Sequence, residues 1–328
     1  MNKILTIGVI IVLIIAGVWF FTNAGPNNSQ NTSQNLEKVK IGFHPILASL
    51  PLFVAQENGY FTEAGIEPVL VPMQTGELMI DAFVRGDIDI TPESTLVPVL
   101  RVEQTNPGHI KIYATGDITK ENPFATLIVP SDSDILSLNN LENKRVGVFP
   151  GGTSKNLLRR FLQSEGLNTE TIEFIELPPT TQLQALSSGS IDALLAFEPG
   201  RTIALESGNF RTLYSGVWAS ILDHNPLGSG FISTEFIEKN PELAKKTVEA
   251  FDRANQFIKT NDEDTRAIIA EHVELDRNIA DKVVPLYFSD SSDMNKNAVA
   301  ELISILVEVG ELNQIVDTQD MFYEPNLR

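Results

Sequence analysis

Apolar residues in this chain recur in two alternating patterns, which predict strands that alternate with helices. Short apolar runs such as Val39–Phe43 and Ala193–Phe197 have the length and composition of buried strands. Longer segments such as Leu78–Arg85 and Asn156–Gly166 place apolar residues at helical spacing and end at or beside a glycine. Strand–helix alternation of this kind is typical of a mostly parallel sheet with helices on both faces.

The same reasoning assigns most of the remaining chain. The further predicted strands are Glu67–Val71, Ile88–Ile90, Lys111–Ala114, Ala125–Val129, Thr171–Leu177 and Phe210–Tyr214. The further predicted helices are Leu50–Gly59, Pro241–Thr260, Glu263–His272, Arg277–Val284 and Asn295–Gly310. Thr91–Ser94 is expected to open another helix after the third strand.

An internal repeat organises the alternation. Lys40–Ser49 and Arg145–Ser154 both run from a strand through a proline turn towards a helix, with Gly42 matching Gly147 at an offset of 105. Downstream, Asp81–Asp89 and Gln184–Asp192 share the frame x-Ala-apolar-x-x-Gly-x-Ile-Asp at an offset of 103. Two similarities in the same order and at nearly the same spacing predict two topologically similar α/β lobes that share a cleft.

Composition and charge narrow the class of protein. The chain has 328 residues, a net charge of −19 and no cysteine. Strong acidity argues against binding to nucleic acid or to anionic lipid, because both need basic surface. Absence of cysteine excludes disulfides, thiolate catalysis and attachment of a lipid through a thioether in this chain.

The first residues have the character of a targeting or anchoring segment. Residues 4–21 are apolar except for Thr6, and Lys3 precedes them. Their length lies between a signal-peptide core and a membrane span, so an uncleaved anchor and a cleaved signal both remain open. Either alternative places the rest of the chain outside the cytoplasm, at the cell surface or in a periplasm. Residues 22–38 have no apolar period and are predicted to be a flexible linker.

The chain is predicted to cross between the lobes twice. Residues 39–129 and 229–328 would form the first lobe, and residues 130–228 would form a second lobe inserted into it. Two crossings create a hinge, about which the lobes can close on a ligand.

The order of motifs resembles a known family. Pro51–Glu67, Gly86–Asp89, Leu138–Val148, Phe197–Pro199 and Phe236–Glu242 resemble, in order, segments of the nitrate, sulfonate, taurine and thiamine-precursor solute-binding proteins, the SsuA/ThiY-like family. The resemblance spans about Lys38 to Gly310. It implies a periplasmic-binding-protein type II fold, two Rossmann-like lobes with mixed, mostly parallel sheets, and delivery of a small molecule to the permease of an ABC importer.

Polar residues at the predicted strand ends are the candidate ligand contacts. The resemblance places contacts at His44, Ala48 and Ser49; the alternative for His44 is capping of the turn before Pro45. The next two strand ends contribute Gln74, Thr75, Gly76, Glu93 and Ser94, and the second lobe contributes Thr180 and Thr181. Helix capping is the simpler role for each Thr and Ser, and it is compatible with ligand binding. Asn225 completes the set.

Gly151, Gly152, Thr153 and Ser154 form the strongest candidate. Together with Gly147 they nearly match a phosphate-binding loop, but Thr153 stands where the loop needs lysine, and Lys155 comes two residues late. ATP is therefore a poor occupant. An oxyanion or a carbonyl group of a small ligand suits the helix N-terminus better.

Glu198 is the most distinctive single candidate, since it ends an apolar strand beside Pro199. It could pair with a ligand amine; the alternatives are an ion pair with Arg201 or a hinge contact. Glu77, Glu93 and Glu198 outnumber Lys155 in these loops, which favours a cationic or N–H-rich ligand, such as a thiamine-precursor pyrimidine, over a sulfonate or nitrate.

The sequence thus predicts a monomeric extracytoplasmic solute-binding protein without cofactor, metal site or covalent chemistry. The histidines are scattered without ligand spacing. One alternative is a membrane-tethered sensor module without transport. Another is an enzyme resembling the pyrimidine synthase of thiamine biosynthesis, which the missing cysteines make a poor match.

Overall fold

The computed structural model describes residues 36–325. The predicted anchor or signal segment (1–21) and nearly all of the predicted linker (22–38) lie outside the described residues. The first strand begins at Glu37, so the last two residues assigned to the linker belong to that strand. No helix within residues 36–325 is long and apolar enough to cross a membrane.

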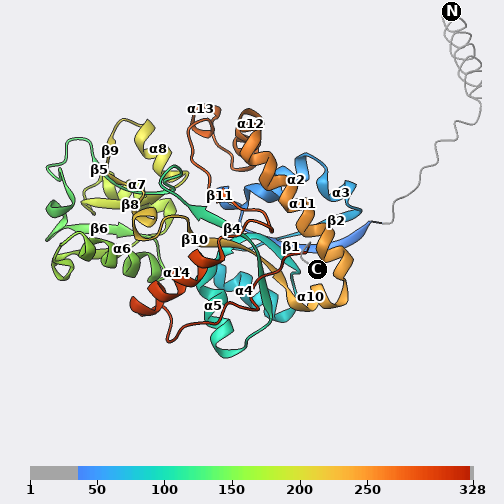
Figure 1. Cartoon of the computed structure of the whole chain (residues 1–328). Helices are drawn as coiled ribbons and strands as arrows, with labels where there is room; N and C mark the ends of the chain where they lie inside the picture. The colour runs from blue at the N-terminus through green and yellow to red at the C-terminus, as the bar shows by residue number, and fades with distance from the viewer. Residues whose placement is uncertain (1–35, 326–328) are drawn as a thin grey trace, which may run out of the picture. The chain divides into compact units, whose positions relative to one another are not determined.

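Two mixed sheets form the framework, which confirms the α/β fold class (Figure 1). The six-stranded sheet has the order β11-β4-β10-β3-β1-β2. Its strands are β1 (Glu37–Phe43), β2 (Ile66–Pro72), β3 (Ile90–Thr95), β4 (Ile110–Ile118), β10 (Asn225–Ser233) and β11 (Tyr287–Phe288). The five-stranded sheet has the order β7-β6-β8-β5-β9. Its strands are β5 (Ala125–Pro130), β6 (Arg145–Val148), β7 (Glu173–Glu176), β8 (Ala193–Phe197) and β9 (Phe210–Ser215).

Helices connect the strands within each sheet and extend beyond β10. Before β4 lie η1 (Leu47–Ser49), α2 (Leu50–Glu57), α3 (Tyr60–Glu63), α4 (Gly76–Arg85) and α5 (Leu96–Thr105). Between β5 and β10 lie η2 (Leu138–Leu141), α6 (Thr153–Ser164), η3 (Thr169–Thr171), α7 (Pro179–Ser187), α8 (Gly200–Glu206) and α9 (Val217–Ile221). After β10 come α10 (Thr234–Lys239), α11 (Pro241–Thr260), α12 (Asp262–His272), α13 (Arg277–Ala280) and α14 (Lys296–Glu308).

Antiparallel pairing is more extensive than strand–helix alternation suggests. β1 pairs in parallel with β2 and β3, and β6 with β7 and β8. β10 and β5 are antiparallel to their neighbours in the two sheets. We expected Ala125–Val129 in the first lobe, but β5 lies in the five-stranded sheet, so the chain changes sheet before Ala125 rather than at Pro130.

Two further expectations about elements were wrong. Thr91–Ser94 extends β3 instead of opening a helix, because antiparallel pairing with β10 continues as far as Thr95 opposite Gly228. Pro92 is accommodated by a register shift in β10 between Ser229 and Phe231, which suits a residue without a backbone N–H. The helix expected over Arg277–Val284 ends at Ala280.

The repeat seen in the sequence corresponds to one structural unit that occurs twice. Asp89 accepts a hydrogen bond from the backbone N–H of Lys40, and Asp192 accepts the equivalent bond from Arg145, both at 2.8 Å. The side chains of Lys40 and Arg145 also donate to the carbonyls of Gly86 and Gly189, the glycines that follow α4 and α7, each three residues before the aspartate. The two halves of each motif are therefore bonded to one another, which explains their nearly constant spacing.

The pKa values of Asp89 and Asp192 are shifted in opposite directions, although the two aspartates have the same backbone hydrogen bond. The Arg145 guanidinium also donates to both carboxylate oxygens of Asp192, and it holds the pKa of Asp192 below its usual value. Burial raises the pKa of Asp89, because the Lys40 ammonium is directed to Gly86 and only the backbone N–H of Lys40 reaches the carboxylate. Arginine in place of lysine thus lowers the pKa of the aspartate in the second copy of the repeat, because the guanidinium reaches both carboxylate oxygens.

Candidate functional site

The segments that follow β1 and β2 meet the end of β3 around His44. The His44 Nδ1 atom lies 3.0 Å from the Met73 carbonyl oxygen, which can only accept a hydrogen bond, so Nδ1 carries the proton. Nε2 lies 3.4 Å from Ser94 Oγ and accepts from it. Burial lowers the pKa of His44, which favours this neutral form. His44 therefore connects the loop after β1 with the loop after β2 and with the end of β3, rather than only capping its own turn.

Gly76 completes this junction. Thr75 caps α4 by accepting from the Leu78 N–H at 3.3 Å, and Gln74 before it is exposed. A Cβ atom on Gly76 would lie 2.6 Å from Thr95 Oγ1 and 3.4 Å from Ser94 Oγ, so only glycine permits this approach. His44, Gly76 and Ser94, which are far apart in the sequence, are thus brought together as predicted site residues.

Two other candidates of the first group are buried. Ala48 is 7 % exposed and Ser49 is fully buried. The Ser49 hydroxyl oxygen has no hydrogen-bond partner within residues 36–325. Both residues belong to η1 and are buried there, and their expected contact with a ligand stays a prediction.

Glu93 occupies a cradle between strands. Gly116 of β4 and Gly228 of β10 lack side chains where the carboxyl group lies, and a Cβ on Gly228 would approach Glu93 Oε1 to 2.3 Å. Burial raises the pKa of Glu93 to about 8, so the group is mostly protonated at neutral pH and can donate a hydrogen bond.

The glycine turn before α6 is already bonded to carboxylates of the chain itself. Gly151 and Gly152 have φ values of +107° and +81°, a region that favours glycine. The Gly151 N–H donates to Glu176 at 3.2 Å, and Thr153 Oγ1 donates to Glu311 at 2.8 Å. Ser154 is half-buried in the first turn of α6.

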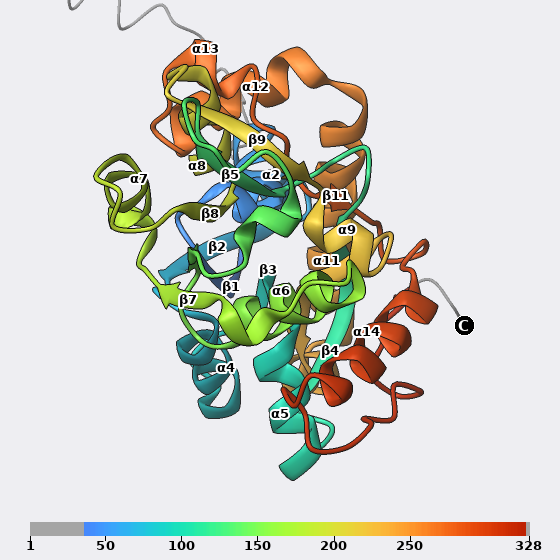
Figure 2. The ribbon, with the colours of Figure 1, turned by 90° about the vertical axis from the view of Figure 1, so that its left-hand side faces the viewer.

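Glu311 also links two helices that follow strands of different sheets. Arg101 of α5, the helix that directly follows β3, donates to the same Glu311 oxygen as Thr153, at 2.7 Å. Asn156 of α6 donates to the other oxygen at 2.6 Å. The helices that follow β3 and β6 therefore both donate to one carboxylate, which comes shortly after α14 in the chain. Figure 2 shows the ribbons of α5, α6 and α14.

The carboxylate of Glu198 is buried and hydrogen-bonded to other groups of the protein. Its side chain has no exposed surface, and it accepts from Arg201 Nη1 at 2.8 Å, from Thr202 and from the Val284 N–H at 3.3 Å. The ion pair with Arg201, one of the alternatives that we weighed, is present, and the Val284 N–H adds a bond from a distant segment. The other alternative, a hinge contact, stays a prediction. In this structure both oxygens of the carboxylate are already bonded within the protein, and its expected pairing with a ligand amine stays a prediction.

The remaining candidates lie apart from the His44 junction. Thr180 and Thr181 are exposed at the start of α7, and the Thr181 hydroxyl donates to the Pro178 carbonyl at 3.0 Å. Asn225 is fully buried at the start of β10, where its amide donates to the Trp218 carbonyl at 3.2 Å. Its carbonyl oxygen has no partner within residues 36–325.

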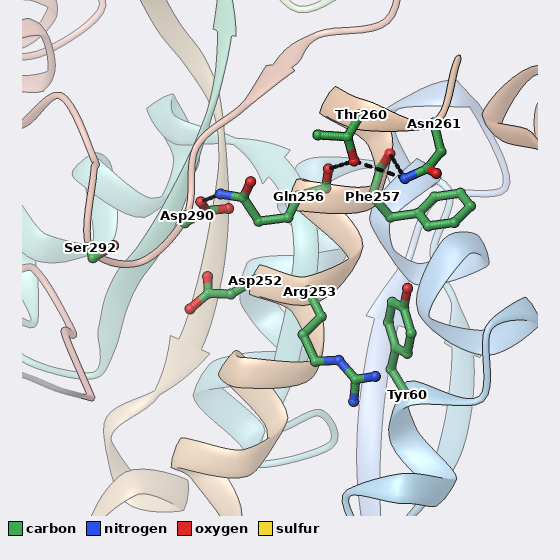
Figure 3. Close-up of a pocket in the computed structure, with 9 residues that line it drawn as sticks. All are labelled: Tyr60, Asp252, Arg253, Gln256, Phe257, Thr260, Asn261, Asp290 and Ser292. Carbon is green, nitrogen blue, oxygen red and sulfur yellow. Dashed lines mark hydrogen bonds between the residues drawn. The ribbon is translucent and has the colours of Figure 1, made fainter. Parts of the chain in front are cut away.

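A pocket of about 450 Å³ lies beside α11, away from the predicted contacts (Figure 3). Tyr60 of α3 and Arg253 of α11 form part of its wall, with the guanidinium carbon 4.1 Å from the ring centroid. Asp252 and Asp290 line another part and are bonded by Ser291 and Gln256 respectively. The other carboxylate oxygen of Asp290 is buried without a hydrogen-bond partner within residues 36–325. The same residues contain no group of side chains that could hold a metal ion.

Sequence reasoning missed Glu311, Glu176 and Arg101. Glu176 ends β7 and is the second-last residue of the predicted strand Thr171–Leu177, so the rule that selected the other strand-end residues could have included it. Glu311 lies 158 residues from Thr153, and no spacing signal connects the two.

The fold and the placement of these loops define an α/β protein of the periplasmic-binding-protein kind. The crystal structure of the periplasmic aliphatic sulphonate binding protein SsuA from Escherichia coli has a TM-score of 0.73 to this chain, at 20% identity, and the match covers 88% of this chain and 93% of that one. The desulfurization enzyme DSZB shares the fold with a TM-score of 0.64 at 15% identity, covering 87% of this chain and 96% of DSZB.

The chain belongs to the NMT1-like family, which matches residues 32–274. Among curated proteins, it is similar to one of Bacillus subtilis (strain 168) that carries the provisional name aliphatic sulfonates-binding protein. The two are 22% identical over 319 residues, covering 95% of this chain and 93% of the relative. These similarities confirm the predicted family and connect it with binding proteins.

Proposed function

We propose that this chain is an extracytoplasmic solute-binding protein that captures a small organic molecule and delivers it to an ABC importer. The observation that carries the proposal is the convergence of strand-end elements: His44, Gly76 and Ser94 meet at one junction, and α5 and α6 meet at Glu311. Polar groups at the ends of strands from two sheets are the arrangement in which open α/β proteins bind ligands. The names of the similar proteins agree with this function.

The ligand would lie between two lobes that close about a hinge. In this proposal the six-stranded sheet and the helices after β10 form one lobe, and residues 125 to about 224 form the inserted lobe. The ligand classes are those of the family resemblance: a thiamine-precursor pyrimidine, a sulfonate or taurine, or nitrate. The partner is a membrane permease, the protein acts as a monomer, and residues 1–21 direct it across the membrane or anchor it there.

A catalytic function is the second candidate, because the enzyme DSZB shares the fold. This chain has no cysteine, so it cannot use a thiolate as a nucleophile. The curated relative named above is a binding protein, which favours binding without catalysis. A sensor module without transport is not favoured by the similar proteins.

A thermal-shift screen of the full chain tests the proposal. A ligand that binds only the folded state raises Tm, and at about 100 times its Kd it adds about 2.7 kcal/mol of stability. We expect one of the ligand classes above to give such a shift and the His44→Gln variant to weaken it. His109→Gln, the same substitution at an exposed position, is the matched control. A screen without any response, or a response equal in both variants, would contradict the proposal.

A further inference from the structure

The Gly151–Lys155 turn is a position where an oxyanion ligand would be expected, yet two carboxylates of the chain occupy its donors. Glu176 accepts from the Gly151 N–H and from Lys155 Nζ, both at 3.2 Å. Glu311 accepts from Thr153 and Asn156 with its two oxygens, and its side chain is only 4% exposed. The positive end of α6 favours negative charge, and both nearby negative charges come from the protein itself.

The basic side chains nearest these loops are also neutralised. Lys155 pairs with Glu176, and Arg101 pairs with Glu311 at 2.7 Å. On the next strand end, Arg201 pairs with the fully buried Glu198 at 2.8 Å. A free sulfonate or nitrate arriving here would meet two carboxylates and no unpaired cation from this set. It would therefore be repelled, or would have to displace a carboxylate that is already well bonded.

Apolar side chains stand exposed in the same loops. Ile46 follows β1, Leu78 lies in the first turn of α4, and Phe149 follows β6; their exposed fractions are 49%, 48% and 42%. Exposed apolar residues in strand-end loops suit the apolar body of an organic ligand better than a small hydrated anion.

We infer that Glu311 and Glu176 are specificity-determining residues that exclude oxyanions, so that the ligand is a neutral or cationic organic molecule with an apolar body. This inference rests on the proposed solute-binding function and refines its ligand class. Glu311 fills the position beside the first turn of α6 that an anionic head group would take. Glu176 holds the Gly151 N–H and the ammonium of Lys155, the donors that such a group would need.

Removing the carboxylates of Glu311 and Glu176, one at a time, tests the inference. In Glu311→Ala, Arg101, Thr153 and Asn156 lose their acceptor and can bind an added anion; in Glu176→Ala, Gly151 and Lys155 do. The probes are methanesulfonate and sulfate, added to the full chain at ionic strength matched with sodium chloride. We expect the wild type to show no saturable Tm shift and each variant to bind methanesulfonate at least about tenfold more tightly than the wild type does.

Glu308→Ala is the matched control, because Glu308 also pairs with α6, through Arg160, but is 61% exposed and does not contact the turn. It should respond like the wild type, which separates site binding from the general stabilisation that sulfate produces. Glu176 is 37% exposed, so its replacement tests the inference even where Glu311→Ala does not fold.

Two results would overturn the inference: a wild type that binds methanesulfonate as tightly as both variants, or variants that gain no more than Glu308→Ala. Neither result bears on solute binding in general. Conversely, a wild type that binds no compound of the screen in the preceding section counts against the proposed function, and the variant responses to methanesulfonate remain measurable.

Discussion

Glu93 shows how a single side chain depends on its neighbours. The residue lies in a strand, and the glycines at positions 116 and 228 leave space for its carboxyl group. Burial raises its pKa from 4.5 to about 8, so the folded protein retains a proton that the unfolded chain releases near pH 4.5. Between these pH values the native state binds more protons than the unfolded state, and the contribution of Glu93 to stability falls as pH rises.

The variant Glu93→Gln should remove this dependence. At or below about pH 4.5 the variant and the wild type should differ little through this group, whereas near pH 8 the variant should be more stable by up to about 4 kcal/mol. Urea denaturation at a series of pH values measures the difference. Glu301→Gln, at an exposed position of α14, is the control and should follow the wild type. A constant difference between Glu93→Gln and the wild type across pH would contradict the assigned protonation.

Gly42 and Gly147 show what the repeat means for the packing of each element. A Cβ on Gly42 would lie 2.5 Å from Met79 Sδ and 2.6 Å from Ile88 Cδ1, and a Cβ on Gly147 would lie 2.5 Å from Ile191 Cδ1. Ile88 and Ile191 occupy the same place in the second repeated motif. Each strand glycine therefore packs directly on the isoleucine of its own copy, so the two motifs are two halves of one contact.

Replacing either glycine by alanine should overpack the core. We expect Gly42→Ala and Gly147→Ala each to lower the free energy of unfolding by about 1–3 kcal/mol, because the facing isoleucine is buried and must shift. Urea denaturation measures this loss. Gly200→Ala is the control, since nothing lies within 4 Å of the added Cβ and Gly200 begins α8. A loss in Gly200→Ala as large as in the other two variants would show that the facing isoleucines are not the cause.

Across the molecule, Glu198 joins segments that belong to the two sheets. It directly follows β8 of the five-stranded sheet and accepts from the N–H of Val284, which precedes β11 of the six-stranded sheet. Asn122 adds a second link by donating to the Pro285 carbonyl at 3.2 Å. An exposed ion pair, Lys282 with Glu206 of α8, connects the same region.

The buried link should matter far more than the exposed one. Glu198→Gln leaves the half-buried Arg201 without its charge partner, and we expect it to lower the free energy of unfolding by about 3 kcal/mol. Glu206→Gln breaks the exposed pair between the same segments and should cost less than about 1 kcal/mol. Thermal or urea denaturation compares them directly. If Glu198→Gln unfolds like the wild type but loses ligand binding, the carboxylate contacts ligand instead.

The sequence by itself determined the local features of this protein. Apolar periodicity and glycine stops placed most strands and helices, because these patterns depend on neighbours along the chain. The two-copy repeat followed from residue identity alone, and its paired hydrogen bonds are the physical basis for it. Strand-end reasoning selected Gly76 and Ser94, and the family resemblance selected His44. The fold brings the three together, since parallel strands direct their carboxyl ends to one edge.

Only the tertiary structure decided how those groups are satisfied. Thr91–Ser94 became a strand because β10, more than 130 residues later, pairs with it. Glu198 was assigned to a ligand, but Arg201, Thr202 and Val284 surround it. The turn predicted to hold an oxyanion has Glu311 beside it. Charge pairing in a folded core depends on contacts between segments that are distant in the sequence. The apolar periodicity of the sequence therefore does not predict it.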